Sequence, residues 1–180
     1  KMFSKRIYDY DEAYSYIFDF ARRNTLDKYL DFLREAKRAV EIPVIASINC
    51  VSDSDWQSFA RKIQTTGVDA IELNIFILPS DSRRTGEQNE KVYYDIIREV
   101  KRYVDIPVAV KTGYYFSSLA NSLVRLSETG IDGLVLFNRP YNTDFDIDRL
   151  EPSQGAVLSS DEEYNHTLRW ISILSGRLKC

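Results

Sequence analysis

The sequence predicts an α/β protein built from parallel βα units, and three observations carry that prediction. Its apolar segments are short, rich in Val, Ile and Leu, and lack polar alternation, which is typical of parallel strands covered on both faces. Segments with helical spacing of apolar residues separate them. The third observation is an internal repeat, because REAKRAVEIPVIA (34–46) and REVKRYVDIPVAV (98–110) are identical at eight of thirteen positions, 64 residues apart.

A second pair of matching segments extends the repeat. TGVDAIELN (66–74) returns as TGIDGLVLFN (129–138), 63 residues further on and with one extra residue before the final Asn. Each repeating unit therefore contains two strands and two helices, and the single domain is expected to divide at about residues 26–103 and 104–176. Strands are expected at 43–48, 70–76, 107–111 and 133–138.

The helices are identified by apolar spacing and by capping residues. Trp56, Phe59 and Ile63 share one face of an expected helix, and Gly130 provides the C-cap of another. Helices are expected at 10–22, 26–40, 53–66, 88–103, 117–129 and 161–175. In the acidic run 144–148, Asp alternates with apolar residues, which indicates a loop or an edge strand.

Two architectures accept this alternation of parallel strands and helices: an open doubly wound sheet and a (βα)8 barrel. The tandem repeat favours the barrel, which is symmetric in βα units. No glycine-rich phosphate loop follows any expected strand, which argues against a dinucleotide-binding sheet. The predicted fold class is therefore the (βα)8 TIM-barrel family.

The length of the chain fits about half of such a barrel. A barrel takes about 250 residues and eight strands, whereas the 180 residues supply four. The chain is a piece of a longer polypeptide, a half completed by a second copy, or a smaller open sheet. The first of these alternatives is favoured, because the chain starts at Lys1 and its last residues before Cys180 resemble the segment that leads into another strand. Because four strands with an open edge expose an apolar seam, we expect a homo-oligomer.

Composition narrows the classes of partner. The net charge is -3 and no dense run of Lys and Arg occurs, which argues against nucleic acid and anionic lipid. No apolar stretch approaches the roughly 20 residues of a membrane span, and no signal peptide is visible. Cys50 and Cys180 lie far apart without metal-ligand spacing. A cytoplasmic location, a small-molecule substrate and no metal are therefore expected.

Polar side chains stand at the ends of the four expected strands. They are Asn49, Asn74, Lys111 and Asn138. Since chemistry in parallel α/β folds gathers at the carboxyl ends of the strands, three amides and one ammonium are expected to converge on one rim. Amides donate and accept hydrogen bonds and so suit a planar heterocycle, whereas a lysine suits a site where negative charge develops.

Four segments around these residues carry a family resemblance: IPVIASIN, AIELNIFILPSD, IPVAVKTGYYFS and GLVLFNRPYNTD. They resemble the third to sixth strands of the dihydroorotate dehydrogenase family of FMN-dependent (βα)8 barrels. The resemblance implies an FMN-dependent oxidoreductase that oxidises a dihydropyrimidine or another small cyclic substrate. It places Lys111 beside the flavin N1–O2 edge, Asn74 against flavin or substrate, and Asn138 against the pyrimidine. Asn49 resembles a third-strand Asn of some branches and is assigned to the flavin.

One position departs from the family pattern. The family's catalytic base, Cys or Ser, follows the fourth-strand Asn by three residues, where this chain has Ile77. A hydrocarbon accepts no proton, so Ser80 and Ser82 on the polar loop 80–90 are the candidates for the base. The substrate is left open between dihydroorotate and other small cyclic compounds.

The prediction about the cofactor depends on segments outside this chain. The family holds the flavin phosphate on glycine-rich loops after the seventh and eighth strands, which the sequence does not supply. FMN is therefore expected in the complete protein, while this fragment is expected neither to retain it nor to be active.

Two other functions stay open. With Lys111 as a nucleophile, the chain would be a Schiff-base TIM-barrel lyase or aldolase. The third interpretation is a non-catalytic half-barrel. His166, the single histidine, stands in the first turns of a capped helix and is interpreted as a solvated surface residue.

Overall fold

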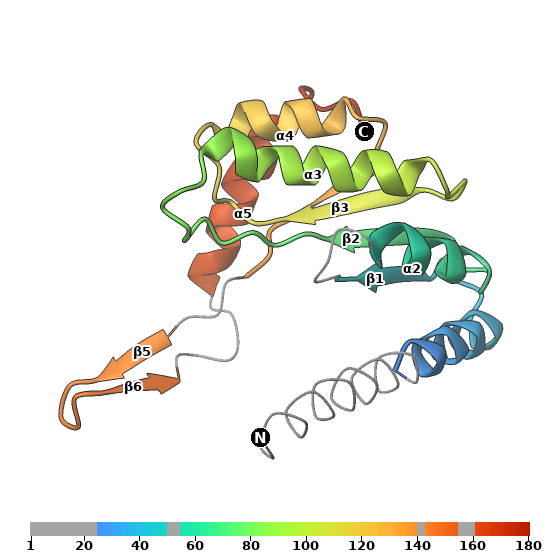
Figure 1. The fold of residues 1–180 in the computed structure, drawn as a ribbon, viewed down its shortest axis with the longest axis horizontal. Helices are drawn as coiled ribbons and strands as arrows, with labels where there is room; N and C mark the ends of the chain where they lie inside the picture. Colours follow the sequence, from blue (N-terminus) through green and yellow to red (C-terminus); the bar gives the residue numbers. More distant parts are fainter. Residues whose placement is uncertain (1–24, 50–54, 140–142, 155–160) are drawn as a thin grey trace, which may run out of the picture.

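The computed structural model of the protein describes residues 25–49, 55–139, 143–154 and 161–180. Four parallel strands form one sheet, in which chain order and spatial order agree (Figure 1). They are β1 (Ile45–Ile48), β2 (Ala70–Asn74), β3 (Val108–Thr112) and β4 (Gly133–Leu136). Because each strand pairs in parallel with the next, the chain has the α/β architecture of a partial TIM barrel, which confirms the predicted fold class.

Helices alternate with these strands as predicted. They are the helix over residues 25–39, α2 (Asp55–Gln64), α3 (Gly86–Lys101), α4 (Leu119–Ser127) and α5 (Asp161–Leu174). α3 begins two residues before its expected start because Thr85 caps it. The Gln88 N–H donates to Thr85 Oγ1 (3.2 Å), and the Thr85 N–H donates to Gln88 Oε1 (2.8 Å), which is a capping box. The expected helix at 10–22 lies outside the described residues.

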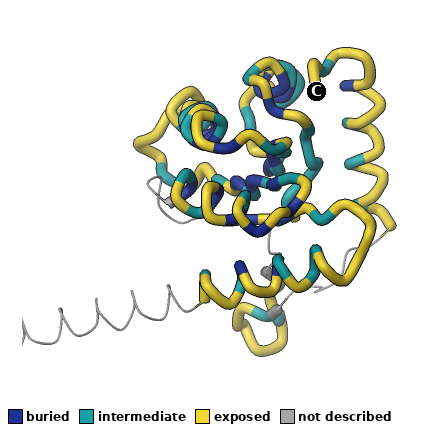
Figure 2. Tube along the Cα trace, turned by 90° about the vertical axis from the view of Figure 1, so that its right-hand side faces the viewer, coloured by how far each residue is buried: buried dark blue, intermediate teal, exposed yellow. Residues whose placement is uncertain are grey.

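One face of the sheet packs against helices and holds the core. Its strand residues are Ala46, Ile48, Ile71, Leu73, Val108 and Val110, all buried. Helix residues such as Ile63, Ile97 and Leu123 belong to the same cluster. Each fully buried side chain of this kind contributes roughly 1.5–3 kcal/mol. Figure 2 shows the buried residues where the helices meet the sheet, whereas α5 is mostly exposed.

The opposite face of the sheet is only partly covered by the described residues. Ile45 is 58% exposed, Ser47 is exposed, and Lys111 is half-buried. The expectation that both faces are covered is therefore wrong for this part of the chain. The physical reason is that this face points to the inside of a TIM barrel, where side chains from other strands complete the packing. Self-association through the open face stays a prediction.

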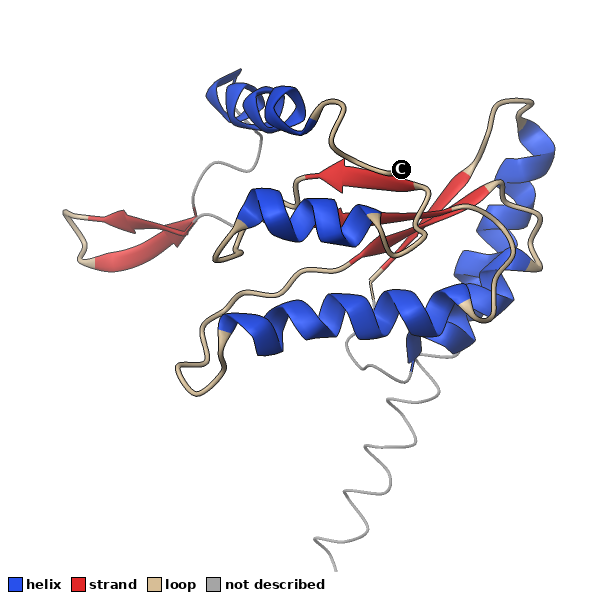
Figure 3. Cartoon of the chain, turned by 90° about the horizontal axis from the view of Figure 1, so that it is seen from above, coloured by secondary structure: helices blue, strands red, loops and turns tan. Residues whose placement is uncertain are grey.

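A β-hairpin follows β4 and stands apart from the sheet, as Figures 1 and 3 both show. β5 (Thr143–Asp146) pairs in antiparallel register with β6 (Glu151–Gln154). Asp146 Oδ1 accepts hydrogen bonds from the N–H groups of Asp148 and Arg149, both at 3.0 Å, which fixes the turn. The acidic run is thus half strand and half turn. Among the described residues, no helix is both long and apolar enough to cross a bilayer.

The first repeat unit is fastened at the amino end of β2 by a carboxylate, here called the Asp69 clamp. Asp69 Oδ2 accepts the Val44 N–H (2.6 Å) and the Lys37 ammonium (2.6 Å). The Asp69 N–H donates in turn to the Val44 carbonyl (2.9 Å). One side chain therefore joins the preceding helix, the approach to β1 and the start of β2.

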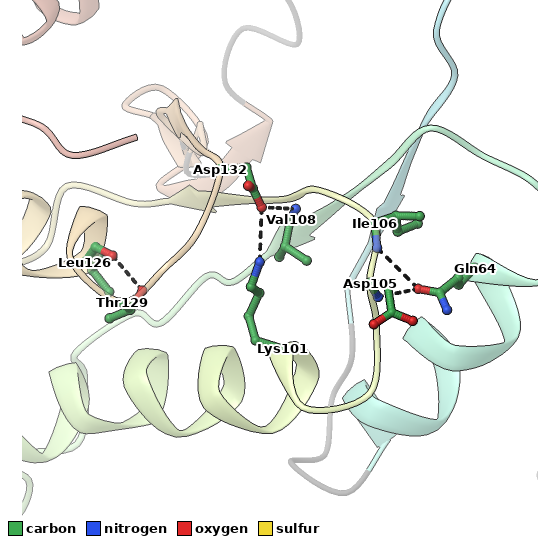
Figure 4. A network of polar contacts seen from close by, with 8 residues as sticks. All are labelled: Gln64, Lys101, Asp105, Ile106, Val108, Leu126, Thr129 and Asp132. Carbon is green, nitrogen blue, oxygen red and sulfur yellow. Dashed lines mark hydrogen bonds and ion pairs between the residues drawn. The ribbon is translucent and has the colours of Figure 1, made fainter.

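The second repeat unit carries the same contact at the amino end of β4, here called the Asp132 clamp. Asp132 Oδ2 accepts the Val108 N–H (2.8 Å) and the Lys101 ammonium (3.2 Å), as Figure 4 shows. The Asp132 N–H donates to the Val108 carbonyl (2.8 Å). Gly67 and Gly130 precede the two clamps by two residues and both adopt a φ of +84°, a conformation that favours glycine. The sequence repeat is thus also a repeat of contacts.

The last residues of α2 and α4 also hold the chain at this end of the sheet. Gln64 Oε1 accepts the N–H groups of Asp105 (2.6 Å) and Ile106 (3.4 Å), just before β3 (Figure 4). At the equivalent position, Ser127 Oγ accepts the Lys179 N–H (3.0 Å). These bonds satisfy backbone donors that would otherwise lie without partners next to the core.

Candidate functional site

The carboxyl ends of the strands bring the predicted polar residues to one rim. Asn74 of β2 is the register partner of Lys111 of β3. Two residues beyond β4, the Asn138 N–H donates to the Thr112 carbonyl (2.7 Å) and so stays attached to the end of β3. Asn49 follows Ile48, the last paired residue of β1, and therefore lies at the same end of the sheet.

Two of the predicted residues contact one another directly. Asn138 Nδ2 donates to Asn74 Oδ1 (2.5 Å) and lies 3.5 Å from the Ile75 carbonyl oxygen. The bond is partly buried and links residues 64 apart in the sequence. It fixes the orientation of both amides, because each amide has one carbonyl oxygen and one NH₂ group. Among the described residues, the Asn74 Nδ2 donor and the Asn138 Oδ1 acceptor have no partner, so both are available to a ligand.

Lys111 and Asn49 complete the rim without direct contacts. Lys111 is half-buried beside Asn74, and no carboxylate among the described residues pairs with its ammonium group. An unpaired, partly desolvated cation favours an anionic partner. Asn49 is exposed and its side chain has no hydrogen bond within the described part of the chain. The strand register places these residues at the same end of the sheet, while their roles stay predictions.

The loop after β2 holds the positions linked to the missing base. Ile77 packs against the core, and Ser80 and Ser82 are exposed. The Arg83 guanidinium binds Asp81 between the two serines (3.0 Å). Neither serine side chain forms a hydrogen bond within the described residues, so nothing in this part of the chain activates them. Their role as base stays a prediction.

Tyr93 of α3 supports the rim from below, which the sequence did not indicate. Its phenol is buried and receives backbone hydrogen bonds from Ile77 and Gly113. Burial raises the pKa of Tyr93 to about 12, against the smaller lowering effect of these two bonds. One neutral phenol therefore ties the loop after β2 and the loop after β3 to the helix layer.

Aromatic side chains continue the rim from strand to strand, and we call this set the aromatic rim. It consists of Phe76, Tyr114, Tyr115, Phe137 and His166. The His166 ring lies 5.3 Å from the Tyr114 ring and 5.8 Å from the Phe137 ring, between centroids. His166 is exposed, as predicted, but it is not a free surface residue. The sequence missed this because α5 gives no local signal of the two rings it meets.

A pocket of 260 Å³ opens between the end of β4 and α5. Its lining residues are Tyr114, Phe137, Asn138, Arg139, Glu163, His166 and Thr167. Arg139 and Glu163 form a two-pronged ion pair at its wall, with Nε–Oε2 at 2.7 Å and Nη2–Oε1 at 3.0 Å. A larger hollow of 730 Å³ lies between α3 and α4. It is on the outer helix layer, away from the strand ends. The pocket of 260 Å³ is the candidate site because Asn138 lines it.

The comparison with protein families decides the identity of this fold. A family model described as dihydrouridine synthase matches residues 24–142. The chain belongs to the dihydrouridine synthase family. The match includes all four strands of the parallel sheet and the residues Asn49, Asn74, Lys111 and Asn138.

Individual proteins that are similar to this dihydrouridine synthase family member are named dihydroorotate dehydrogenase. A protein of Methanocaldococcus jannaschii, named dihydroorotate dehydrogenase B (NAD(+)), catalytic subunit, is 28% identical over 131 residues, covering 71% of this chain and 42% of that protein. A protein of the same name from Bacillus cytotoxicus is 26% identical over 117 residues, covering 62% and 37%. The chain spans less than half the length of these relatives.

These similarities confirm the predicted family resemblance. Dihydrouridine synthases and dihydroorotate dehydrogenases share an FMN-binding TIM barrel, and both are oxidoreductases. The chain is thus a divergent, dihydroorotate dehydrogenase-like part of an FMN-dependent oxidoreductase family. Within the described residues, no three His, Cys, Asp or Glu side chains gather where they could hold a metal ion.

Proposed function

We propose that this chain forms part of an FMN-dependent oxidoreductase that interconverts a dihydropyrimidine ring, or a similar small cyclic imide, and its unsaturated form. The observation that carries the proposal is the hydrogen bond between Asn138 Nδ2 and Asn74 Oδ1 at the carboxyl ends of β2 and β4. It holds two amides next to Lys111, at the end of the sheet where TIM barrels bind their ligands.

The free groups of the two amides match the edge of a pyrimidine ring. Asn74 Nδ2 is free to donate to a ring carbonyl, and Asn138 Oδ1 is free to accept from the adjacent ring N–H. A ring with neighbouring C=O and N–H groups presents the complementary pair. A site built to hydrogen-bond such groups rejects rings that lack them, because its own polar groups would stay unpaired.

The charge of Lys111 suits a contact with the flavin. Its ammonium has no anionic partner among the described residues, and the electron-rich N1–C2=O edge of an isoalloxazine ring is a partner of the required polarity. We assign Lys111, Asn74 and Asn49 to the flavin side of the site, and Asn74 and Asn138 to the substrate side. When bound, FMN accepts the hydride that leaves the substrate.

The names of the similar proteins support the same ring chemistry. Dihydroorotate and dihydrouridine both contain a saturated pyrimidine ring, and they occur in the names of the relatives and of the family. In the proposed reaction the chain's residues bind the ring edge and favour negative charge beside Lys111. Ser80 and Ser82 stay candidates for the base.

Flavin reduction tests the proposal in the complete polypeptide. The purified protein is saturated with FMN, mixed without oxygen with dihydroorotate or 5,6-dihydrouracil, and followed by flavin absorbance. We expect bleaching with at least one compound, and a loss of at least about 10-fold in the bleaching rate for Lys111→Ala, since one preorganised charge contributes about that much or more. Lys62→Ala changes an exposed lysine of α2 and serves as the control.

A protein that binds no flavin, or flavin that no dihydropyrimidine reduces, would contradict the proposal. Borohydride treatment with a carbonyl compound separates the alternative, because a lyase or aldolase would become covalently labelled at Lys111. Equal reduction rates for Lys111→Ala and Lys62→Ala would remove Lys111 from the mechanism.

A further inference from the structure

We propose that His166 is the catalytic base of this site, taking the proton that the substrate loses. The inference rests on the proposed function and adds a residue from α5 to the rim. Its starting point is the pocket of 260 Å³, because His166 and Asn138 both line it. The group assigned to the substrate edge and an imidazole therefore face the same space.

The aromatic rim holds the imidazole in place. Tyr114 meets the His166 ring edge-to-face at 63°, and Phe137 meets it at 51°. These contacts join α5 to the loop after β3, which follows Lys111, and to the loop after β4, which carries Asn138. A ring held by two neighbours loses less freedom when it reacts, which is a requirement for efficient proton transfer.

Other groups at the rim are poorly suited to take a proton. Ile77 is a hydrocarbon, and Ser80 and Ser82 have no activating partner among the described residues. The Tyr93 pKa is raised to about 12, mainly by burial. Burial, followed by the interaction with Tyr115, also raises the Tyr114 pKa. Imidazole is the side chain that changes its charge near neutral pH, which suits a general base.

Four charged side chains stand near His166: Glu162, Glu163 and Arg169 on α5, and Arg139 at the wall of the pocket. On α5 itself Glu163 lies one turn earlier, and it is paired with Arg139 from the loop after β4. From the loop after β3, the neighbours are the phenols of Tyr114 and Tyr115. The carboxylate and guanidinium offset each other, so the wall of the pocket adds little net charge near the imidazole.

The proton step balances as follows. The C–H bond next to a ring carbonyl breaks, and its proton passes to the unprotonated imidazole nitrogen of His166. The electron pair of that bond becomes the second bond of the new C=C. When bound, FMN would supply the two-electron oxidation by accepting the hydride from the neighbouring carbon, which balances the two electrons that the substrate loses. The imidazolium then returns its proton to water.

His166→Gln tests the step, because glutamine keeps hydrogen-bonding groups but does not take up a proton at neutral pH. In the complete, FMN-loaded protein we expect the rate of flavin reduction by dihydroorotate or 5,6-dihydrouracil to fall at least about 100-fold, the usual contribution of a general base. Orotate and uracil should bind within about threefold of the wild-type affinity. Asn165→Gln, one residue away and exposed, is the matched control and should reduce flavin at the wild-type rate.

The pH profile separates a base from a packing residue. The dependence of the wild-type reduction rate on pH should differ from that of His166→Gln, because only the wild type has a base at this position. An unchanged rate, or a lower rate with an unchanged profile, would overturn the inference while leaving the proposed function intact. If no dihydropyrimidine reduces the wild-type flavin, the proposed function fails first.

A spectroscopic measurement tests the position of His166 even if no dihydropyrimidine reduces the flavin. The imidazole proton resonances of His166 are identified as those missing from the spectrum of His166→Gln. We expect them to shift when the FMN-loaded wild type is titrated with orotate, because the ring lines the ligand pocket. Resonances that stay in place at saturating orotate would overturn the placement of His166 at the site.

Discussion

At the amino ends of the strands, polar side chains are saturated by the chain itself, whereas at the carboxyl ends several keep a free hydrogen-bonding group. Asp69 and Asp132 each bind a backbone N–H and a lysine. At the opposite end, Asn74 and Asn138 share one hydrogen bond and leave the other half of each amide without a partner among the described residues. One end of the sheet is held together by its own side chains, and the other is the end at which we propose that a ligand binds.

Removing the Asp132 clamp should produce the largest loss of stability. Asp132→Ala leaves the Val108 N–H without its acceptor next to the core, which costs about 2 kcal/mol of unfolding free energy. Urea denaturation measures it. Asp105→Ala, an exposed carboxylate at the same end without a side-chain partner among the described residues, should stay within about 0.5 kcal/mol of the wild type. Similar losses in both variants would show that the clamp has no special role.

Gln64 should contribute about half as much to the unfolding free energy as Asp132 does. Gln64→Ala removes the acceptor of the Asp105 and Ile106 N–H groups, for a loss of about 1 kcal/mol by the same denaturation experiment. Gln57→Ala, on the same helix, has no comparable bond in the described structure and is the matched control. A Gln64 variant as stable as the Gln57 variant would contradict the assignment.

Acid should weaken the amino end selectively. The Lys37 hydrogen bond holds the pKa of Asp69 below its usual range, and the Val108 N–H does the same for Asp132. A carboxyl group with a lowered folded-state pKa adds stability that is complete above its unfolded pKa, about 4, and is lost as the pH falls through the folded value. Asp132→Asn keeps an acceptor for Val108 but carries no charge.

The comparison of wild type and Asp132→Asn measures how much the negative charge of Asp132 contributes to stability. The difference in unfolding free energy between them should be present at about pH 7 and shrink towards about pH 3. Urea curves at several pH values give the result. A difference that grows as the pH falls would mean that the sign of the linkage is wrong.

The carboxyl end should give the smallest change in stability. Lys111→Met removes a half-buried cation without a partner among the described residues, so unfolding should change by less than about 0.5 kcal/mol, or become slightly more costly. The same variant should bind flavin more weakly. A marked loss of stability would show that Lys111 is a structural residue and would remove the contrast between the two ends.

The repeat made most of the fold predictable from the sequence. Strand and helix positions follow from apolar segments that recur 63 or 64 residues apart. Each described helix and each strand of the parallel sheet lies within a few residues of its expected range. β6 was missed, because its sequence EPSQ contains no residue that favours a strand. The prediction that the second face of the sheet is covered was wrong. The apolar sequence of Val108–Thr112 is typical of a fully buried strand, but the side chains that cover this face come from other parts of a barrel.

The site was predictable only in part. The rule that chemistry gathers at strand ends selected Asn74, Lys111 and Asn138. The hydrogen bond between the two amides depends on the path of the chain beyond β4, which no local pattern encodes. The same holds for His166, which meets the ring of Tyr114 from 52 positions further along the chain. Contacts between distant loops require coordinates.

The duplicated clamp has a consequence for how this sequence can be rearranged. Segments 37–74 and 101–138 each begin with the lysine that their own aspartate binds, and each ends with one of the two paired asparagines. We therefore expect that either segment can replace the other. A chimera that carries two copies of one segment should keep both aspartate contacts, and comparing the two possible chimeras would show which segment better supports the pair of asparagines.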